Sequence, residues 1–286
     1  MTIFNLGSIN VDLVYRVPHL PGPGETIAST SFKKGLGGKG ANMSVAIARA
    51  GSRCTHIGSV GDDGQWTVDT LASAGVDTRH IHRSLPTGHA VIYVDDAGEN
   101  SIVLNAGANS CVSSDVVAAA LAEAKDTDTF ICQNETNLQA EAAQMAHAKG
   151  LSVAYAAAPF SAEAVKAVLP YLGLLVLNEV EAEQLQTETG HPISELPVRD
   201  IVVTLGAAGC RWYRGGQRRD FAAIPVTPVD TTGAGDTFTG YLIAALDQGK
   251  PMEAAIALAG KAGALMVTRL GTAEVIPTLQ EVTEAF

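Results

Sequence analysis

Basic residues are scarce in this sequence, and charged residues are few overall. Among its 286 residues, 19 are Lys or Arg and 30 are Asp or Glu, which gives a formal net charge of -11 at pH 7. Proteins that bind nucleic acid or dock on anionic membranes need clustered Lys and Arg side chains. The charge balance therefore excludes both as the main partner and favours a small molecule.

Cysteine is equally sparse, and its residues are scattered along the chain. None belongs to a C-x-x-C pair, and none has histidines nearby at the spacing of metal ligands. Neither a zinc site nor a disulfide framework is therefore indicated. We expect reduced core thiols in a cytoplasmic protein, at Cys54, Cys111, Cys132 and Cys210.

Long hydrophobic runs and an export signal are also missing. No apolar run approaches the roughly 20 residues that span a bilayer. The first residues, MTIFNLGSINVD, have no basic stretch before the apolar ones and reach Asp12 early. This is not the form of a signal peptide, so we expect neither export nor contact with a membrane.

Hydrophobic residues are abundant, at 47%, which is enough for a sizeable buried core. Short β-rich runs alternate with longer helical stretches along most of the chain. This alternation predicts an α/β fold, with a doubly wound, mostly parallel sheet, helices on both faces and ligands beyond the carboxyl ends of the strands. The predicted strands are IFNLGS, THIGSVG, TFICQ, SVAYA, LLVLN, IVVTLG, CRWYR and a run near 217 to 225, and the predicted helices are 38 to 51, 63 to 75, 136 to 149, 161 to 168, 179 to 188, 235 to 248 and 252 to 268.

Two segments, about 11 to 34 and 89 to 107, do not fit this alternation. In the second, DDAGEN lies between two β-branched runs, which is typical of a hairpin. Residues 90 to 94 place apolar side chains on both faces of a strand, so both faces need a cover. We predict a small β-sheet lid within a single domain, 1 to 286, with one face over the substrate and the other on a second subunit. A hairpin packed simply on the main core is the alternative.

The run DTTGAGD predicts an anion site. Gly233, Ala234 and Gly235 can turn the chain tightly and present consecutive backbone N–H groups where an apolar helix begins. Asp236 follows in the first turn of that helix, beside any phosphate bound there. The alternative is that Asp236 only caps the helix, but a cap does not require two glycines and a small residue before it.

A second glycine-rich segment, GLGGKGANMSVAIARAG, leads into an Ala-rich helix. It contains Gly35-x-Gly37-x-x-Gly40, formally a dinucleotide fingerprint. The fingerprint should join the first core strand directly to its helix, and here a long segment separates the two, which disfavours NAD. No G-x-x-x-x-G-K-S/T run occurs, so a P-loop enzyme is disfavoured as well.

Together, GGKGAN and DTTGAGDTF closely resemble the two signatures of the ribokinase-like carbohydrate kinases (the PfkB family). The likeness extends in the family's order through GSINVD, PGPGET, SVGDDGQ, GENSIVLNAGAN, NEVEAE and VTLGAAG, and so covers nearly the whole chain. Lys39 in GGKGAN makes the sequence similar to the ribokinase branch rather than to the fructokinase or nucleoside kinase branches.

The resemblance implies ATP-dependent phosphoryl transfer to a sugar hydroxyl, with Asp236 as the catalytic base. It also implies an anion hole around the transferring phosphoryl group, formed by the N–H groups of Gly233, Ala234 and Gly235. Such chemistry needs positioning and charge neutralisation more than covalent help.

For the nucleotide and Mg²⁺, the matching positions are Asn178 and Glu181 in NEVE, with Thr204, Gly206 and Gly209 in VTLGAAG. The family's N-x-x-E element helps to organise Mg²⁺ and the phosphates, through water. The alternative for Asn178 and Glu181 is a capping box at the start of a helix.

For the sugar, the resemblance implies a set of polar residues and glycines near the first strand. Carboxylates and amides suit vicinal hydroxyls because each makes two hydrogen bonds in one plane. Taken alone, an acid such as Asp12 is more often a solvated loop residue. The implied sugar-binding residues are Asn10, Asp12, Gly38, Lys39, Asn42 and Glu135.

Ribokinases also bind a monovalent cation, K⁺, beside the anion hole, where it would help to order the phosphate-binding turn. Val275 stands where a ribokinase often has a serine, so one side-chain oxygen is missing here. AYAAAPF lacks the Asn-Pro that often ends this strand, and the stretch 188 to 203 is shorter than usual. The implied cation-binding residues are Asp230, Thr232, Met266, Arg269 and Gly271.

We therefore predict a cytoplasmic kinase, a homodimer through its lid, that transfers phosphate from ATP to the primary hydroxyl of D-ribose. Within the class, the alternative substrates are 2-deoxyribose, another small sugar or a nucleoside. A catalytically silent sugar-binding regulator on the same fold is the rival from another class, although a binding module has no need of a base such as Asp236.

Overall fold

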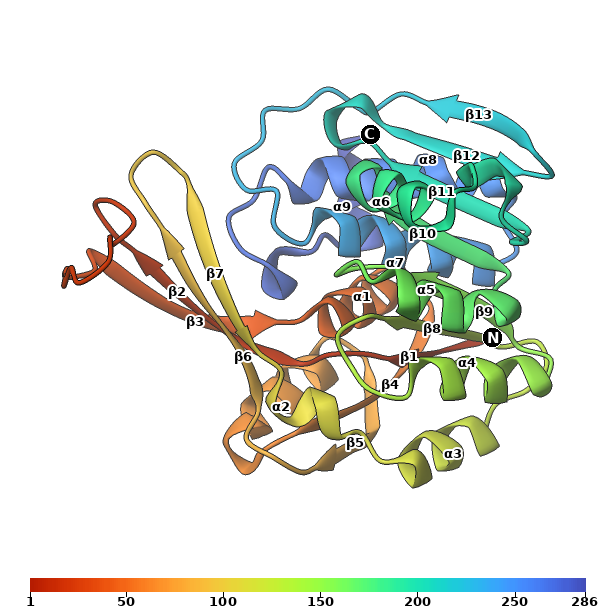
Figure 1. Ribbon diagram of the computed structural model, residues 1–286, viewed down its shortest axis with the longest axis horizontal. Helices are drawn as coiled ribbons and strands as arrows, with labels where there is room; N and C mark the ends of the chain where they lie inside the picture. Colours follow the sequence, from red (N-terminus) through yellow and green to blue (C-terminus); the bar gives the residue numbers. More distant parts are fainter.

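A nine-stranded sheet forms the centre of the molecule, which a computed structural model describes over residues 1–286 (Figure 1). The strands lie in the order β13-β12-β11-β10-β9-β8-β1-β4-β5, and all pair in parallel except β12 and β13. This confirms the predicted doubly wound α/β class. The strands are β1 Thr2–Leu6, β4 Arg53–Val60, β5 Asp77–Arg83, β8 Thr129–Gln133, β9 Ser152–Ala156, β10 Leu174–Asn178, β11 Asp200–Thr204, β12 Cys210–Arg214 and β13 Gln217–Phe221.

Helices cover both faces of this sheet, because its central strands are apolar on both sides. Neighbouring residues such as Phe130 and Ile131 are both fully buried, in separate hydrophobic clusters on the two faces. One cluster holds α1 Lys39–Arg49, α2 Gln65–Ser73, α7 Ala234–Asp247, α8 Met252–Met266 and α9 Leu279–Ala285, and the other holds α3 Ser114–Ala122, α4 Gln139–Ala148, α5 Ala162–Val168 and α6 Glu179–Thr189. None of the helices combines the length and the apolar character that a membrane span requires.

The alternation of β-rich and helical runs predicted most of these elements. Strand β5 and helices α3 and α9 were not predicted. β5 reads DTRHIHR, which has too few apolar residues to indicate a strand. It lies at the edge of the sheet, where only one neighbour pairs with it.

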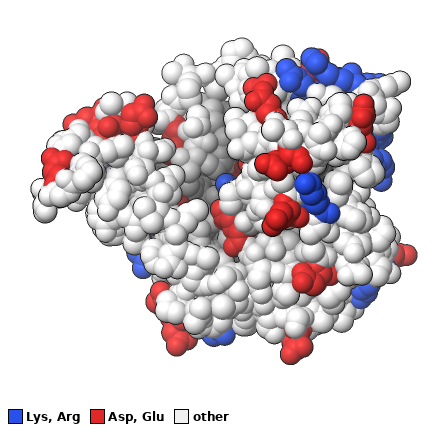
Figure 2. Space-filling view, in the orientation of Figure 1, with Lys and Arg blue, Asp and Glu red and all other residues white.

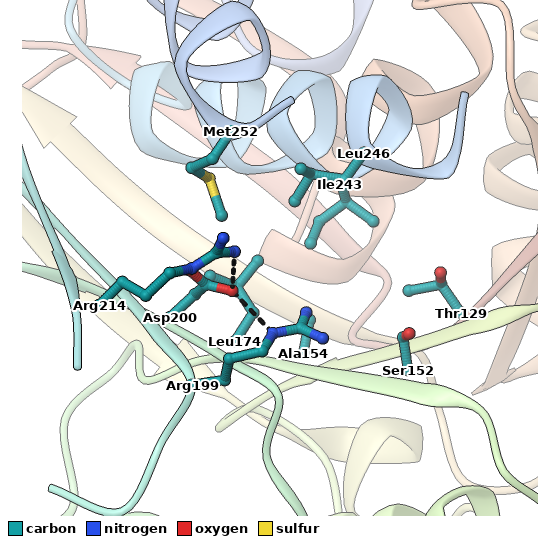
Figure 3. A pocket seen from close by; sticks show the side chains of 10 residues that line it. All are labelled: Thr129, Ser152, Ala154, Leu174, Arg199, Asp200, Arg214, Ile243, Leu246 and Met252. Carbon is teal, nitrogen blue, oxygen red and sulfur yellow. Dashed lines mark hydrogen bonds and ion pairs between the residues drawn. The ribbon is translucent and has the colours of Figure 1, made fainter. Parts of the chain in front are cut away.

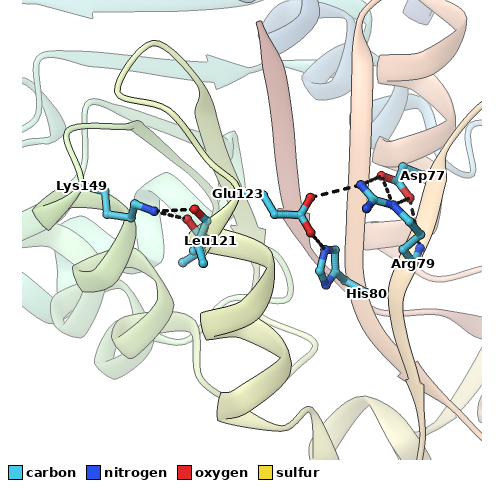
Figure 4. Close-up of polar contacts among 7 residues, drawn as sticks. Asp77, Arg79, His80, Leu121, Glu123 and Lys149 are labelled. Carbon is cyan, nitrogen blue, oxygen red and sulfur yellow. Dashed lines mark hydrogen bonds and ion pairs between the residues drawn. The ribbon is translucent and has the colours of Figure 1, made fainter.

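Polar contacts fix this edge strand to the helix beside it (Figure 4). Arg79 and His80 of β5 both contact the carboxylate of Glu123, at 3.1 Å each, just after α3 ends. Lys149, after α4, donates to the carbonyls of Leu121 and Ala122 at the end of α3. These bonds satisfy carbonyls that a helix leaves free at its carboxyl end.

A second sheet of four strands projects from the body as a lid (Figure 1). Its order is β3-β2-β6-β7, and β2 and β6 pair in parallel in the middle. The predicted hairpin is confirmed, with Asp95 accepting bonds from the N–H groups of Ala97 and Glu99 in its turn. The alternative of a hairpin packed on the main core is wrong. The strands are β2 Asn10–Arg16, β3 Ser31–Gly37, β6 Gly88–Val94 and β7 Asn100–Asn105.

Helix α7 carries Asp236 at its start and packs directly on α1, so their close approach positions the candidate site. A Cβ on Gly240 of α7 would lie 2.5 Å from Cβ of Ala46 and 2.9 Å from the carbonyl of Met43. Only glycine allows this spacing.

We therefore predict that Gly240→Ala lowers the free energy of unfolding by about 1 to 3 kcal/mol, because the added methyl forces α7 away from α1. Urea denaturation measures this change. Gly260→Ala in α8 is the matched control, because nothing lies within 4 Å of its Cβ position. The free energy of unfolding of the control should rise by about 0.5 to 1 kcal/mol, because alanine restricts the unfolded chain more than glycine does. Equal behaviour of the two variants would contradict the packing argument.

Candidate active site

The carboxyl ends of the central strands open on a cavity of about 250 Å³. Strands β10 and β11 end in register there, with Asn178 beside Thr204. Figure 2 shows the hollow between the lid and the body. Seven of the predicted site residues line this cavity: Lys39, Asn178, Glu181, Thr204, Gly233, Gly235 and Asp236.

The glycine turn leads into α7 with free backbone donors. Gly233 is the N-cap residue, in the left-handed region at φ 74°, which favours glycine. The N–H of Ala234 donates to the carbonyl of Thr231 at 3.2 Å, whereas those of Gly233 and Gly235 have no hydrogen-bond partner. Two unused donors at the start of a 14-residue helix form an electropositive point suited to an anion.

Asp236 does not cap its helix, so that alternative is wrong. Its carboxylate makes one hydrogen bond, which it accepts from Nδ2 of Asn42 at 2.8 Å. Burial raises the pKa of Asp236, while the positive charge of Lys39 and the bond from Asn42 oppose that rise. The result is a buried carboxylate that faces the cavity and is available to accept a proton.

Lys39 supplies the positive charge nearest to these acids. The carboxylate of Asp236 raises the pKa of Lys39 most, burial opposes this, and Glu135 and Glu181 raise it further. One ammonium group thus interacts electrostatically with three carboxylates. Glu135 is held in place beside it, since it accepts bonds from the hydroxyl of Ser8 and from the backbone N–H of Lys39 at 3.2 Å.

Asp12 is buried on the inner face of the lid, so it is not the solvated loop acid of the alternative interpretation. Burial raises the pKa of Asp12 to about 7, and Glu135, Glu274 and Asp236 add to the rise. Its place depends on Gly37 of β3, because a Cβ there would lie 2.1 Å from Oδ2 of Asp12.

Asn10 and Asn42 extend this polar surface. Asn10 accepts a bond at 2.7 Å from Nδ2 of Asn109, which leaves its own amide N–H groups free to donate. Oδ1 of Asn42 is buried without a hydrogen-bond partner. A buried carbonyl oxygen of this kind needs a donor, and a ligand hydroxyl would provide one.

Sequence reasoning did not single out Ser8 and Asn109. Ser8 connects Glu135 to the N–H of Gly40 at 3.2 Å, and Asn109 is fixed by the N–H of Ile9 at 2.8 Å. Both belong to motifs that the sequence displays, GSINVD and NAGAN. Their partners lie far away in the chain, so only the fold identifies their task.

Asn178 and Glu181 form the capping box that was the alternative interpretation. The N–H of Asn178 donates to Glu181, and the N–H of Glu181 donates to Asn178, each at 2.8 Å. Both residues nevertheless line the cavity. Burial raises the pKa of Glu181, against bonds and charge from Asn178 and Lys39. The capping box therefore also orients this acid.

Gly206 and Gly209 do not line the cavity, unlike Thr204. Gly209 lies at φ 100°, and a Cβ there would be 2.0 Å from the carbonyl of Phe221. The need for glycine at this position is explained by the fold alone. Gly206, at φ 55°, has open space around it.

The residues predicted for a monovalent cation lie where two loops meet. Asp230 accepts bonds from the N–H groups of Thr232 at 2.9 Å and Gly271 at 3.2 Å. The Arg269 side chain donates to the carbonyl of Val275. Met266 adjoins the glycine turn, since a Cβ on Gly233 would lie 3.4 Å from its Cε. The loops therefore combine a carboxylate with backbone carbonyls, which are suitable ligands for a hard cation.

No group of three or more His, Cys, Asp or Glu side chains could hold a metal ion by itself. The acids that line the cavity are Glu181 and Asp236. Mg²⁺ that binds with a nucleotide takes one or two carboxylates, waters and phosphate oxygens. The residues present fit this mode, with the phosphates completing the shell.

The raised pKa of Asp12 predicts a pH-dependent effect on stability. Since the folded-state pKa of about 7 exceeds the unfolded value, folding favours the protonated acid, and stability is lost as pH rises through 7. We expect Asp12→Asn to raise the free energy of unfolding by about 1 to 3 kcal/mol at pH 8. At pH 4 the difference should nearly vanish. Thermal unfolding at the two pH values measures this, and an equal effect at both would contradict it.

Comparison with known proteins identifies the family of this chain. The model of the pfkB family carbohydrate kinases matches residues 2–279. A ribokinase from Haemophilus influenzae is 36% identical over 299 residues, covering 99% of this chain and 97% of the relative. A deoxyribokinase from Salmonella typhi is 31% identical, covering 99% and 98%.

A solved structure of Arabidopsis thaliana ribokinase, complexed with ribose and ATP, has the same fold. It superposes with a TM-score of 0.87 at 27% identity, covering 99% of this chain and 97% of that one. These matches extend over nearly the whole length, as the sequence motifs predicted. The chain belongs to the pfkB family of carbohydrate kinases.

Proposed function

We propose that this chain transfers the γ-phosphoryl group of ATP to the primary hydroxyl of D-ribose, giving ADP and ribose 5-phosphate. The observation that carries the proposal is the buried carboxylate of Asp236, which does not cap its helix and lies beside the free N–H groups of Gly233 and Gly235. A base and an anion site at one point are what phosphoryl transfer to an alcohol requires. The relatives support ribose and ATP as the substrates.

In this mechanism Asp236 accepts the proton of the sugar hydroxyl as its oxygen attacks. Its raised pKa suits that task, because a base works best when its pKa approaches the operating pH. The N–H groups of Gly233 and Gly235, with Lys39, stabilise the charge on the transferring group. Ala234 supports the turn through its bond to Thr231 rather than by donating to phosphate.

The nucleotide would lie along the cavity between the glycine turn and strands β10 and β11. Glu181 and Asn178 would hold Mg²⁺ through water, and Thr204 would contact the nucleotide, near Gly206 and Gly209. Mg²⁺ supplies charge neutralisation on the phosphates when bound. K⁺ would bind between the loops of Asp230 and Gly271 and stiffen the glycine turn. Adding KCl to a potassium-free assay tests this last assignment.

The first prediction from this mechanism concerns Asp236→Asn. It should lower kcat by about 10² to 10⁴, the usual contribution of a positioned base, while ATP binding survives. Coupled measurement of ADP production tests it. Asp247→Asn, a second buried acid at the far end of α7, is the control and should keep kcat near the wild-type value. Near wild-type turnover in Asp236→Asn would remove this residue from the mechanism.

Asp12, Asn10 and Asn42 would recognise the secondary hydroxyls of the sugar. The free amide N–H groups of Asn10 and the unpaired Oδ1 of Asn42 support this assignment. With Gly38, Lys39 and Glu135 nearby, they offer both donors and acceptors to a polyol. Of the alternative substrates, 2-deoxyribose would leave part of this set unpaired, because it lacks one of the secondary hydroxyls.

We therefore predict that ribose exceeds 2-deoxyribose by at least about tenfold in kcat/KM, because a missing hydroxyl leaves buried polar groups unpaired. Asp12→Ala should shrink that preference and mainly raise KM for the sugar. Initial-rate kinetics with both sugars measure this. Equal use of the two sugars by the wild type would overturn the assignment of Asp12.

The lid supports the proposal of a homodimer. The sheet register places Tyr15, Phe32 and Tyr93 in one row on the face opposite Asp12, with ring centroids 4.9 Å and 5.9 Å apart. Val103 lies on the same face and is 62% exposed. An apolar face of this kind suits a second copy of the lid.

We predict that Tyr93→Lys or Val91→Lys, on this outer face, yields monomers because a charge would be buried in the interface. Met145→Lys, on the exposed surface of α4, is the control and should stay dimeric. Sedimentation velocity measures the oligomeric state of the wild type and of each variant. A wild-type protein that is monomeric at micromolar concentration would refute the dimer.

The whole chain, 1 to 286, would act as one kinase domain with the four-stranded sheet as its lid. Its four cysteines are free thiols, which suits the cytoplasm. The rival function, a catalytically silent sugar-binding regulator, would need no base at Asp236. Measuring ATP consumption with and without ribose separates the two.

A further inference from the structure

A second cavity lies at the opposite ends of the central strands from the candidate active site. Figure 3 shows the residues that line it. The cavity has a volume of about 180 Å³, with space for several water molecules. Strands β8 to β11 begin here, the end of α7 covers the cavity, and α8 starts beside it. The residues that line it are Thr129, Ser152, Ala154, Leu174, Arg199, Asp200, Arg214, Ile243, Leu246 and Met252.

Two arginines stand at one end of this cavity, held by a single buried carboxylate. Asp200 is 0% exposed, and it accepts bonds from Nε of Arg199 at 2.9 Å and from Nε and Nη2 of Arg214 at 2.6 and 2.8 Å. Burial raises the pKa of Asp200, but the bonds from Arg214, Trp212 and Arg199 outweigh it and lower that pKa. The carboxylate therefore stays ionised and orients both guanidinium groups.

The arginine pair keeps unused donors. Two guanidinium groups share the carboxylate of Asp200, and the charge of Glu253, which pairs with Arg219, also acts on Arg214. Both terminal nitrogens of Arg199 and Nη1 of Arg214 have no hydrogen-bond partner. Their side chains are 66% and 52% exposed, so a ligand can reach them. Free guanidinium donors in a fixed orientation match the oxygens of a carboxylate or phosphate.

The rest of the cavity suits the body of a small organic molecule. The hydroxyls of Thr129 and Ser152 face it from the other end and make no hydrogen bond in the structure. Ile243, Leu246 and Met252 form an apolar wall above them. Five of the ten lining residues are hydrophobic, so the cavity combines an apolar wall with convergent polar groups, as a site for a short organic molecule requires.

The distribution of arginine along the chain adds an independent observation. Five of its eleven arginines fall between residues 199 and 219, in a chain of net charge -11. Basic side chains gather over this end of the molecule, near β12 and β13 (Figure 2). An anion would therefore meet a locally favourable potential here, away from the acidic surface elsewhere.

We propose that this cavity binds a short organic anion, with its carboxylate or phosphate group on Arg199 and Arg214 and its body against the wall of α7 and α8. The glycine turn lies at the start of α7 and this cavity at its end, so the ligand does not compete with the nucleotide. The proposal does not rest on the proposed kinase activity.

The test is a ligand-observed NMR titration of the full chain at low ionic strength, with saturating ADP to occupy the nucleotide site. The probes are butyrate, butyl phosphate and the neutral butyramide. We expect one or both anions to bind with a Kd of about a millimolar or tighter, and butyramide to bind at least tenfold more weakly. Arg199→Gln should raise the Kd for the anion at least about tenfold, because a charge-assisted hydrogen bond is lost.

Arg218→Gln is the matched control, because its side chain is exposed on β13 and pairs with Asp220. It should change the Kd by less than about twofold. Ser152→Leu fills the cavity without a change of charge, and it should abolish binding even if Arg199→Gln folds poorly. Failure of both anions to bind, equal binding of butyramide, or unchanged binding to Arg199→Gln or Ser152→Leu would overturn the proposal.

Discussion

One ammonium group among three carboxylates, of which Asp236 and Glu181 are buried, is the interaction on which the candidate active site depends. Lys39 is the only basic side chain that lines the main cavity, where Asp236 and Glu181 face it and Glu135 is held beside it. Without this charge, the acids would take up protons, because burial already raises the pKa of Asp236 and Glu181. Lys39 thus favours the ionised form of the acids around it, against the effect of burial.

The packing of helices and strands brings these groups together. Lys39 begins α1, Asp236 begins α7, and the two helices pack so closely that Gly240 has no room for a side chain. The end of β10 and the start of α6 place Asn178 and Glu181 in the same cavity, and the lid brings Asp12 close enough to Asp236 for the two charges to interact. Segments far apart in sequence therefore converge because parallel strands end at one edge of the sheet.

Much of this could be predicted from the sequence, because its signals are local. Alternating apolar runs predicted the parallel strands, and the glycines before Asp236 predicted an anion site at a helix start. Long-range partners gave no such signal. Asn109 acts on Asn10, and Ser8 acts on Glu135, only because the chain folds back on itself. Strand β5 was missed because its polar sequence is stabilised by Glu123 from another element. The cavity at Arg199 and Arg214 likewise has no local motif, since Asp200 at the start of β11 bonds to Arg214 at the end of β12.

The central claim is that this chain phosphorylates the primary hydroxyl of ribose at the expense of ATP. Phosphorus NMR of a reaction containing the protein, MgATP and ribose tests it most directly. The account predicts that ADP and ribose 5-phosphate appear in equal amounts, and that no ADP accumulates without the sugar. ADP formed at the same rate without ribose, or ATP left intact in the presence of ribose, would contradict it.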